Sequence, residues 1–445
     1  MTAPAQRREV RMVVASSVVG TTIEWYDFFL YGTAAGIIFN KHYFPSDDPL
    51  TGTLLAFATF ALGFVARPVG GLIFGHVGDR LGRKKTLVAT MLIMGVATCA
   101  IGLIPTYATI GVAAPILLVL MRLAQGIAIG GEWGGAVLMA VEYAPPGRRG
   151  FYGSFPQLGL ALGLVLGTGV FAGLGAVMDA GSFVGWGWRI AFLLSAALVI
   201  VGMFIRLRVM ESPAFRRLEA TEARASVPAV ELARGPLSRR HVLLGMGSRW
   251  VEGVAFNTWA VFSISYGTGT LRLPQQTLLV SVMVAALAMI VFIPLCGRLS
   301  DRVGRRALFG VGALVGGAVA YPAFALLGTG SPALVGLGLV LALGVLYPLM
   351  YGPQAAFYAE MFPVNVRCTG ISFVYQFSGI FASGLTPLVL SYLVGRGGGG
   401  YSLVVAYLAV AAVVSAVCTF AVRTHDLRRI ADAERSGQPA MAPAG

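Results

Sequence analysis

Residues 75–84 read GHVGDRLGRK, and residues 297–306 read GRLSDRVGRR, 222 positions further along the chain. A second pair of stretches, 142–149 and 360–367, begins with Glu and ends with Arg in both copies and is separated by 218 positions. Two pairs at nearly the same separation indicate one internal duplication. Each ten-residue stretch follows the second long apolar segment of its half, so we expect two halves of similar construction.

The composition indicates that much of the apolar surface faces lipid. The chain has 445 residues, of which 57% are hydrophobic and 12% charged, whereas a soluble domain carries roughly 25% charged residues. A larger core does not explain the difference, because soluble cores stop growing near ~250–300 residues. The sequence therefore predicts an integral membrane protein.

Twelve apolar segments are long enough to cross a bilayer, which takes roughly 20 residues per helix. They are 11–39, 51–75, 86–105, 112–142, 150–178, 187–208, 241–266, 275–296, 307–328, 332–358, 369–393 and 401–422. We expect an all-α protein with twelve transmembrane helices in two pseudo-symmetric six-helix bundles. The predicted divisions are an N-terminal bundle (1–208), a linker (209–240), a C-terminal bundle (241–422) and a tail (423–445). Such a repeat is a transporter architecture, with the solute site between the halves.

The placement of the basic residues predicts the orientation in the membrane. A net charge of +14 would suggest a nucleic-acid partner in a soluble protein. Most of the 33 Lys and Arg residues, however, fall in segments that we assign to one side of the membrane. This bias is the positive-inside pattern. It predicts a multi-pass protein of the cell (inner or plasma) membrane with both termini in the cytoplasm and no nucleic-acid partner.

Metal, disulfide and enzyme signatures are missing from the sequence. The four cysteines lie far apart, and no His or Cys pair has the spacing of metal ligands. No Walker loop and no GxSxG motif occurs. The first apolar segment carries charged residues in its middle and lacks a small-residue cleavage site, so we do not expect a signal peptide.

The duplicated loops resemble the signature of the major facilitator superfamily. Four further stretches look like its metabolite:proton symporter family: EWYDFFLYG at 24–32, ARPVGG at 66–71, GGEWGG at 130–135 and ESP at 211–213. Residues 130–153 look closest to the shikimate-transporter branch. The resemblance implies alternating access, with the proton as coupling ion and no other cofactor. It also implies small substrates, which in this family are carboxylates such as shikimate, 2-oxoglutarate and citrate, or proline and betaine.

Two carboxylates in the first span are candidates for proton coupling. Placing an ionisable side chain inside a bilayer costs roughly 2.5–3.5 kcal/mol, so we expect each such residue to have a role. Glu24 and Asp27 share a helix face, and Asp27 lies at a depth similar to that of Arg122 in the fourth span. We hypothesise that Asp27 and Arg122 pair when Asp27 is ionised and separate when it is protonated. The alternative is a static ion pair that orients two helices.

Four further charged residues have open assignments. Glu132 is a second proton carrier, the partner of Arg67, or a hydrogen-bonding group that holds helices together. Arg67 is an anchor for a substrate carboxylate, because its planar guanidinium binds a carboxylate through two hydrogen bonds, or the permanent partner of Glu24 or Glu132. Arg249 and Glu252 are three residues apart and could neutralise each other, or Arg249 is the substrate anchor.

Neutral polar and aromatic side chains are expected to complete the substrate site. Tyr and Gln offer hydrogen bonds without the cost of burying a charge, which suits a hydroxylated acid. The alternative for each Tyr is helix packing. The candidates, in addition to Arg67, Arg249 and Glu252, are Tyr31, Gln125, Trp133, Gln157, Asn257, Tyr347, Tyr351, Gln354, Tyr375 and Gln376.

The repeated loops are predicted to form a cytoplasmic gate. Asp79 and Asp301 could cap helix N-termini or bridge to Arg across the two halves. Glu142, Glu360 and Glu211 are expected partners for Arg80, Arg302 and their neighbours, and the glycines are expected to make tight turns. The alternative is that these loops serve only insertion and topology. The predicted gate comprises Gly75, Asp79, Arg80, Gly82, Arg83, Glu142, Arg149, Glu211, Asp301, Arg302, Arg305, Glu360 and Arg367.

These patterns favour proton-coupled uptake of a small organic acid. A monomer suffices for this mechanism. The alternatives are an uncoupled facilitator or zwitterion carrier, a proton antiporter that exports an organic anion, a membrane sensor and a membrane enzyme. The intramembrane arginines favour anionic solutes over cations.

Overall fold

The computed structural model describes residues 3–45, 49–208 and 228–436. Within these ranges every regular element is a helix. Most of the predicted linker, with Glu211, lies outside the described residues, as do the last nine positions of the tail.

The first half contains six long helical segments joined by short ones. They are α1 (Ala3–Ala34) with the π-helical turn η1 (Ala35–Phe39), α3 (Pro49–Leu81), α4 (Arg83–Leu103), α6 (Ala113–Glu142), α7 (Arg149–Ser154) with α8 (Leu158–Val177), and η2 (Phe183–Gly187) with α10 (Trp188–Arg208). The connecting helices are α2 (Asn40–His42), α5 (Tyr107–Ile110) and α9 (Ala180–Ser182).

The second half follows the same plan with more interruptions. Its segments are α13 (Pro236–Ser248), α14 (Trp250–Asn257), η3 (Thr258–Phe262) and α15 (Ser263–Gly269); α16 (Gln275–Val303); α17 (Arg305–Ala318) and α18 (Ala320–Gly328); α19 (Pro332–Leu339), η4 (Val340–Leu346) and α20 (Pro348–Glu360); α21 (Arg367–Gly379), η5 (Ile380–Gly384) and α22 (Thr386–Arg396); and α23 (Ser402–Ala421). The helix α12 (Pro228–Arg234) precedes this half, and α24 (Thr424–Ser436) follows it.

The predicted fold class is confirmed. Among the described residues, nine helical segments are long and apolar enough to cross a membrane. Helix α1 with η1, helix α3, and helices α13 to α15 occupy the positions of the three other predicted spans. The helices are apolar because their outer faces contact lipid, and large side chains such as Val96, Val177 and Ile200 are accordingly exposed.

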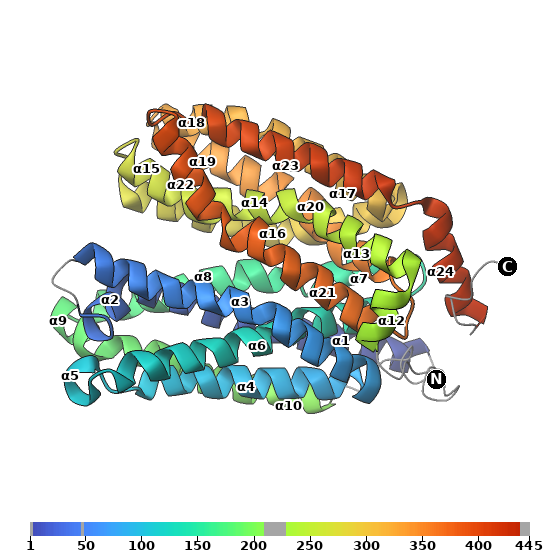
Figure 1. Cartoon of the computed structure of the whole chain (residues 1–445), viewed down its shortest axis with the longest axis horizontal. Coiled ribbons are helices and arrows are strands. Elements are labelled where there is room, and N and C mark those ends of the chain that lie inside the picture. The colour runs from blue at the N-terminus through green and yellow to red at the C-terminus, as the bar shows by residue number, and fades with distance from the viewer. Residues whose placement is uncertain (1–2, 46–48, 209–227, 437–445) are drawn as a thin grey trace.

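The two groups of helices are closest at one end of the molecule. Helices α1 to α10 form the lower bundle in Figure 1 and α12 to α23 the upper one, and the bundles diverge away from the end at which both termini lie. Between the bundles, α3 packs on α21, and α7 and α8 pack on α16. We call this closed end the basic end, because it carries Arg83, Arg149, Arg305 and Arg367.

The glycines of the repeated loops serve two different purposes. Gly82 and Gly304 have φ angles of 109° and 95°, which L side chains rarely adopt, and they form the turns into α4 and α17. Gly75 and Gly297 were predicted to form turns as well, but they lie inside helices α3 and α16. A Cβ atom at Gly75 would come within 2.9 Å of Thr369, and one at Gly297 within 2.7 Å of Gly150. These two glycines let helices of opposite halves approach closely.

Candidate functional site

A chain of hydrogen bonds in the middle of the molecule connects the two halves. The indole Nε1 of Trp133 in α6 donates to Gln157 Oε1 at 2.8 Å. The Nε2 of Gln157 donates in turn to Gln354 Oε1 in α20 at 3.2 Å and to the carbonyl oxygen of Tyr351 at 3.1 Å. Gln157 lies directly after Pro156, where the fifth span breaks between α7 and α8, since proline removes a helical hydrogen bond.

The chain continues to an ion pair in the second half. Gln354 Nε2 donates to Glu252 Oε2 at 3.2 Å, and the Tyr347 hydroxyl donates to Glu252 Oε1 at 2.6 Å. The Nε of Arg249 is 3.2 Å from Glu252 Oε2. The local neutralisation of Arg249 by Glu252 is therefore present in this structure. Arg249 lies at the junction of α13 and α14, where its backbone ends one helix and begins the next.

Aromatic contacts close this chain into a ring. The guanidinium carbon of Arg249 lies 3.8 Å from the ring centroid of Tyr375, and Tyr375 stacks on Trp133 with centroids 3.7 Å apart and an angle of 14°. Both contacts bring together residues that are far apart in sequence. All members of this central ring are buried: Trp133, Gln157, Gln354, Glu252, Arg249 and Tyr375.

Arg67 and Glu24 lie beside the central ring without a hydrogen-bonding partner. The Arg67 guanidinium lies over the rings of Phe28 and Phe64, 4.9 and 4.3 Å from their centroids. Both charged side chains are buried, at 7% and 4% exposure. Among the described residues neither has a hydrogen bond or an ion pair. The predicted permanent pairs of Arg67 with Glu24 or Glu132 are therefore absent, although Arg67 still interacts electrostatically with Glu24, Tyr375 and Arg249.

Asp27 contacts hydroxyl groups instead of the cation that we expected. It accepts hydrogen bonds from Ser195 at 2.6 Å and from Thr98 at 2.8 Å. Thr98 Oγ1 accepts from Gln125 Nε2 at 2.7 Å, and Gln125 Oε1 accepts from Arg122 at 3.2 Å. Asp27 and Arg122 form no direct ion pair in this structure, because Thr98 and Gln125 lie between them. The static pair is therefore absent, and pairing upon ionisation of Asp27 stays a prediction.

The position of the Arg122 side chain explains this difference. Its guanidinium carbon lies 4.2 Å from the ring centroid of Tyr31. Similar depth in two helices does not determine the direction in which their side chains extend. The sequence analysis also missed Thr98 and Ser195, whose only signal was a hydroxyl within an apolar span.

Glu132 is paired with Arg206, which was not among the predicted site residues. Arg206, near the end of α10, contacts both carboxylate oxygens of Glu132 and also donates to the carbonyl oxygen of Leu87 at 2.6 Å. Thr90 donates to the same carboxylate at 2.6 Å. A methyl group at Gly20 would overlap the Arg206 guanidinium, so that glycine provides the space for it. The predicted Glu132–Arg67 contact was wrong because Arg206 occupies the position of the partner.

The other predicted polar residues are distributed over different contacts. The Tyr31 hydroxyl is 2.7 Å from Thr59 Oγ1, and Gln376 donates across the halves to the carbonyl oxygen of Gly130 at 3.1 Å. Asn257 donates to a carbonyl in its own helix. Tyr351 stacks on Tyr347, with centroids 5.2 Å apart. The structure therefore gathers most candidates around the central ring, but Tyr31 and Gln125 lie with Arg122.

The first copy of the repeated loop caps a helix of the opposite half. Asp79 accepts hydrogen bonds from the backbone N–H groups of Cys368 at 3.2 Å and Thr369 at 2.9 Å, at the start of α21. Arg83 lies 3.4 Å from Asp79 and 3.7 Å from Glu142. All three charged side chains are fully buried.

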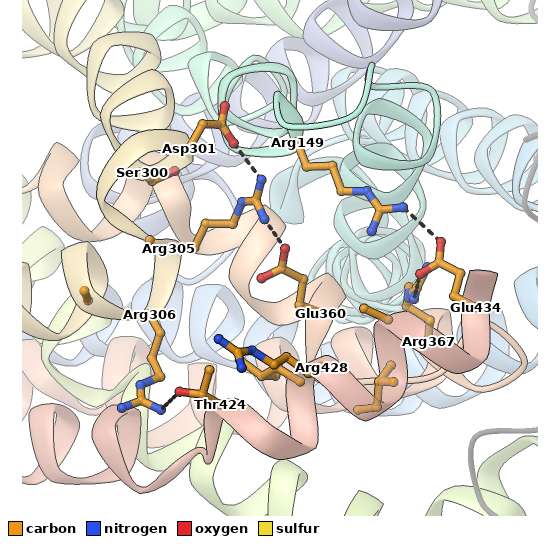
Figure 2. Close-up of a pocket in the computed structure, with 15 residues that line it drawn as sticks. Arg149, Ser300, Asp301, Arg305, Arg306, Glu360, Arg367, Thr424, Arg428 and Glu434 are labelled. Carbon is orange, nitrogen blue, oxygen red and sulfur yellow. Dashed lines mark hydrogen bonds and ion pairs between the residues drawn. The ribbon is translucent and has the colours of Figure 1, made fainter. Parts of the chain in front are cut away.

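The second copy makes the equivalent contacts in the opposite direction. Asp301 accepts from the N–H groups of Gly150 at 2.8 Å and Phe151 at 2.9 Å, at the start of α7. Arg305 pairs with Asp301 and with Glu360, as Figure 2 shows. The carboxylates are thus bound by Arg83 and Arg305, which are neighbours of Arg80 and Arg302 and members of the predicted gate. Arg80 and Arg302 themselves are exposed. Glu211 lies outside the described residues.

Helix α24 adds a carboxylate that the sequence analysis did not identify. Glu434 lies 2.9 Å from Arg149 of the first half and 2.9 Å from Arg367 of the second. Burial opposes ionisation of Glu434, but Arg367 and Arg149 outweigh it and lower its pKa to about 2. Arg367 also lies 3.8 Å from Glu142. The tail is therefore a docked helix that connects both halves.

Comparison with known families identifies the chain. The profile of the Major Facilitator Superfamily matches residues 18–383 and 271–443. The chain belongs to the major facilitator superfamily.

Two proteins from Escherichia coli are relatives of this major facilitator protein and are similar to it over most of their length. One is named an inner membrane metabolite transport protein and is 41% identical, over 86% of this chain and 87% of its own. Another is named a shikimate transporter and is 37% identical, over 92% and 93%. The chain is therefore a multi-pass membrane transporter and not an enzyme, and the family resemblance drawn from the sequence is confirmed.

A solved structure agrees with the fold. A proton:xylose symporter bound to a bromodeoxyglucose superposes with a TM-score of 0.76 over 94% of this chain and 96% of that one, at 16% identity. At this identity the likeness shows the fold of this major facilitator protein and not its substrate.

Proposed function

We propose that this transporter carries a small organic acid into the cell together with protons, by alternating access. The proposal rests on the buried guanidinium of Arg67, which has no hydrogen bond or ion pair among the described residues. A buried charge without a partner is costly, and a substrate carboxylate would supply the missing partner through two hydrogen bonds. The central ring beside it offers Tyr, Gln and Trp groups for hydroxyls. The shikimate transporter among the relatives is consistent with a hydroxylated cyclic acid.

Asp27 is the proposed proton carrier. Its two partners, Thr98 and Ser195, are hydroxyl groups, which can act as donors or acceptors. They can therefore donate to an ionised Asp27 and accept from a protonated one without a change of position. Proton exchange at Asp27 would reach Arg122 through Thr98 and Gln125. In this proposal the proton is the coupling ion, no cofactor is needed, a monomer suffices, and the basic end faces the cytoplasm.

The test is uptake of labelled carboxylates, shikimate included, into proteoliposomes with and without an inward proton gradient. Gradient-driven accumulation of one acid supports symport. Arg67→Lys should then raise the apparent KM by about 10-fold or more, because loss of a charged hydrogen bond costs about 1.5–3 kcal/mol. Arg189→Lys is the matched control, since Arg189 donates to the carbonyl oxygens of Gly102 and Ile104 and is not a predicted substrate contact. An unchanged KM for Arg67→Lys would overturn the anchor role.

Asp27→Asn separates coupling from binding. We expect this variant to equilibrate the acid across the vesicle membrane and to lose accumulation driven by the gradient. Accumulation that persists unchanged would exclude Asp27 as the coupling group.

A zwitterion is the second candidate substrate. Glu24 is buried without a hydrogen-bonding partner close to Arg67, so an ammonium and a carboxylate on one solute would satisfy both. Proline and betaine therefore belong in the uptake panel. Transport of either one, with loss of uptake in Glu24→Gln and no transport of acids, would favour this candidate.

A further inference from the structure

A cavity of about 460 Å³ lies between α24 and the basic end. Figure 2 shows its walls: the start of α7, the turn between α16 and α17, the end of α20, the start of α21, and the inner face of α24. This cavity is separate from the central ring, although five of its lining residues belong to the predicted cytoplasmic gate. The charged residues that line it are Arg149, Arg305, Arg306, Arg367, Arg428, Asp301, Glu360 and Glu434.

Three of the five arginines are neutralised inside the cavity. Arg305 contacts two carboxylates, those of Asp301 and Glu360. Glu434 contacts the other two arginines, Arg149 and Arg367. Three positive and three negative charges therefore balance.

The two remaining arginines form a positive surplus. Among the described residues, Arg306 donates to two neutral oxygens, the carbonyl of Val422 at 2.6 Å and the hydroxyl of Thr424 at 2.9 Å. Arg428 reaches the cavity from α24 (Figure 2) and, within the described part of the chain, has neither a hydrogen bond nor an ion pair. The lining thus carries two positive charges that no acidic side chain of the lining matches.

We propose that this cavity binds a phosphate monoester dianion. Such a group carries a charge of about −1.5 to −2 at neutral pH, which matches the surplus. Guanidinium groups bind phosphate oxygens through paired hydrogen bonds. The volume lies within the roughly 300–1,000 Å³ of small-ligand pockets. The phosphate can belong to a soluble phosphorylated metabolite or to the headgroup of phosphatidic acid, because both present the same dianion.

Occupancy would strengthen the attachment of α24. Arg428 belongs to α24, whereas Arg306 is the second residue of α17. A dianion bound between them would link α24 to α17. It would add to the ion pairs by which Glu434 links α24 to Arg149 and Arg367. The bound phosphate would therefore raise the stability of the chain without any transported substrate.

The test measures thermal unfolding of the purified full-length chain in detergent. Inorganic phosphate, compared with chloride at equal ionic strength, should raise the midpoint of unfolding with increasing concentration. The double variant Arg306→Ala/Arg428→Ala should need at least 10-fold more phosphate for the same rise in the midpoint. Arg239→Ala/Arg423→Ala removes the same charge at exposed positions outside the cavity and should respond like the parent. Arg428→Ala alone is a further variant that removes no hydrogen bond or ion pair among the described residues.

Nanodiscs distinguish the two sources of phosphate. Phosphatidylcholine discs that contain phosphatidic acid are compared with discs that contain phosphatidylglycerol, a monoanionic diester, at equal surface charge. Stabilisation by inorganic phosphate alone identifies a soluble ligand, and stabilisation by phosphatidic acid alone identifies the lipid. No response to either, or equal responses in the cavity variant and its control, would overturn the proposal.

Discussion

The two copies of the repeated loop make the same contacts in different surroundings. In the first copy Asp79 caps α21, and Arg83 is fully buried between two carboxylates. In the second copy Asp301 caps α7, but Arg305 is 16% exposed and borders the cavity under α24. The motif therefore determines which groups meet, while the helices packed around it determine how far water reaches them.

This difference matters because the energy of an ion pair depends on its environment. Breaking a buried pair leaves a charge without compensation and costs about 3–5 kcal/mol. Exposed pairs contribute ~0–1 kcal/mol and are screened by salt. We therefore expect substitutions at equivalent positions of the two copies to have unequal effects.

The largest effect is expected at the capping aspartates. Asp79→Ala should destabilise the protein by about 3–5 kcal/mol. Arg83 and the backbone N–H groups at the start of α21 would lose a partner at a site that water does not reach. Asp301→Ala should cost about 1–3 kcal/mol, since Arg305 keeps Glu360 and some access to water. Thermal unfolding of the two variants in the same detergent measures the difference. Equal shifts would show that burial does not distinguish the two copies.

A smaller effect is expected at the second carboxylate of each copy, and it should depend on salt. Glu142 is fully buried near Arg83, whereas Glu360 is 24% exposed. Glu360→Gln should cost about 1 kcal/mol at low salt and less near 1 M salt, where the Debye length falls to about 3 Å. The cost of Glu142→Gln should stay constant over the same range. Parallel salt dependences of the unfolding midpoint would contradict the comparison.

The smallest effect is local and concerns α24, which covers only the second copy. The ion pairs of Glu434 lower its pKa to about 2, so they stabilise docking fully above the usual carboxyl pKa. This stabilisation is lost as the pH falls through about 2. The protection of residues 424–434 from hydrogen exchange should therefore stay constant above about pH 4.5 and fall progressively between about pH 4.5 and about pH 2. Glu434→Gln should speed exchange already at neutral pH, and loss of protection above about pH 4.5 would refute the ion-pair assignment.

The pattern along the chain was sufficient to predict the fold. A span is recognised from roughly 20 consecutive apolar residues, and that property does not depend on the rest of the molecule. The duplicated loop at 75–84 and 297–306 added the two-half construction. Interruptions within spans were not predicted, but they matter for the site: the break at Pro156 places Gln157, and the junction at Arg249 places its guanidinium.

The members of the candidate site were easier to predict than their partners. Glu132 and Asp27 stood out because a charge in a span is costly wherever it points. Their partners, Arg206 for Glu132 and two hydroxyls for Asp27, depend on which helices are neighbours and on the direction of each side chain. Glu434 had no distinguishing signal, since a carboxylate in a basic tail is common and its two arginines lie 67 and 285 positions away.

By itself, the sequence determined that this is a membrane protein, where its twelve spans lie, that it is duplicated, and which charged residues lie inside the spans. Each of these follows from local composition or from a repeat. The tertiary structure decided the pairings: the central ring that joins the halves, the unpaired Arg67, and the unequal burial of two nearly identical loops. These depend on contacts between residues far apart in the chain. Whether a charge is matched depends on the helices that pack around it, and no local pattern specifies that packing.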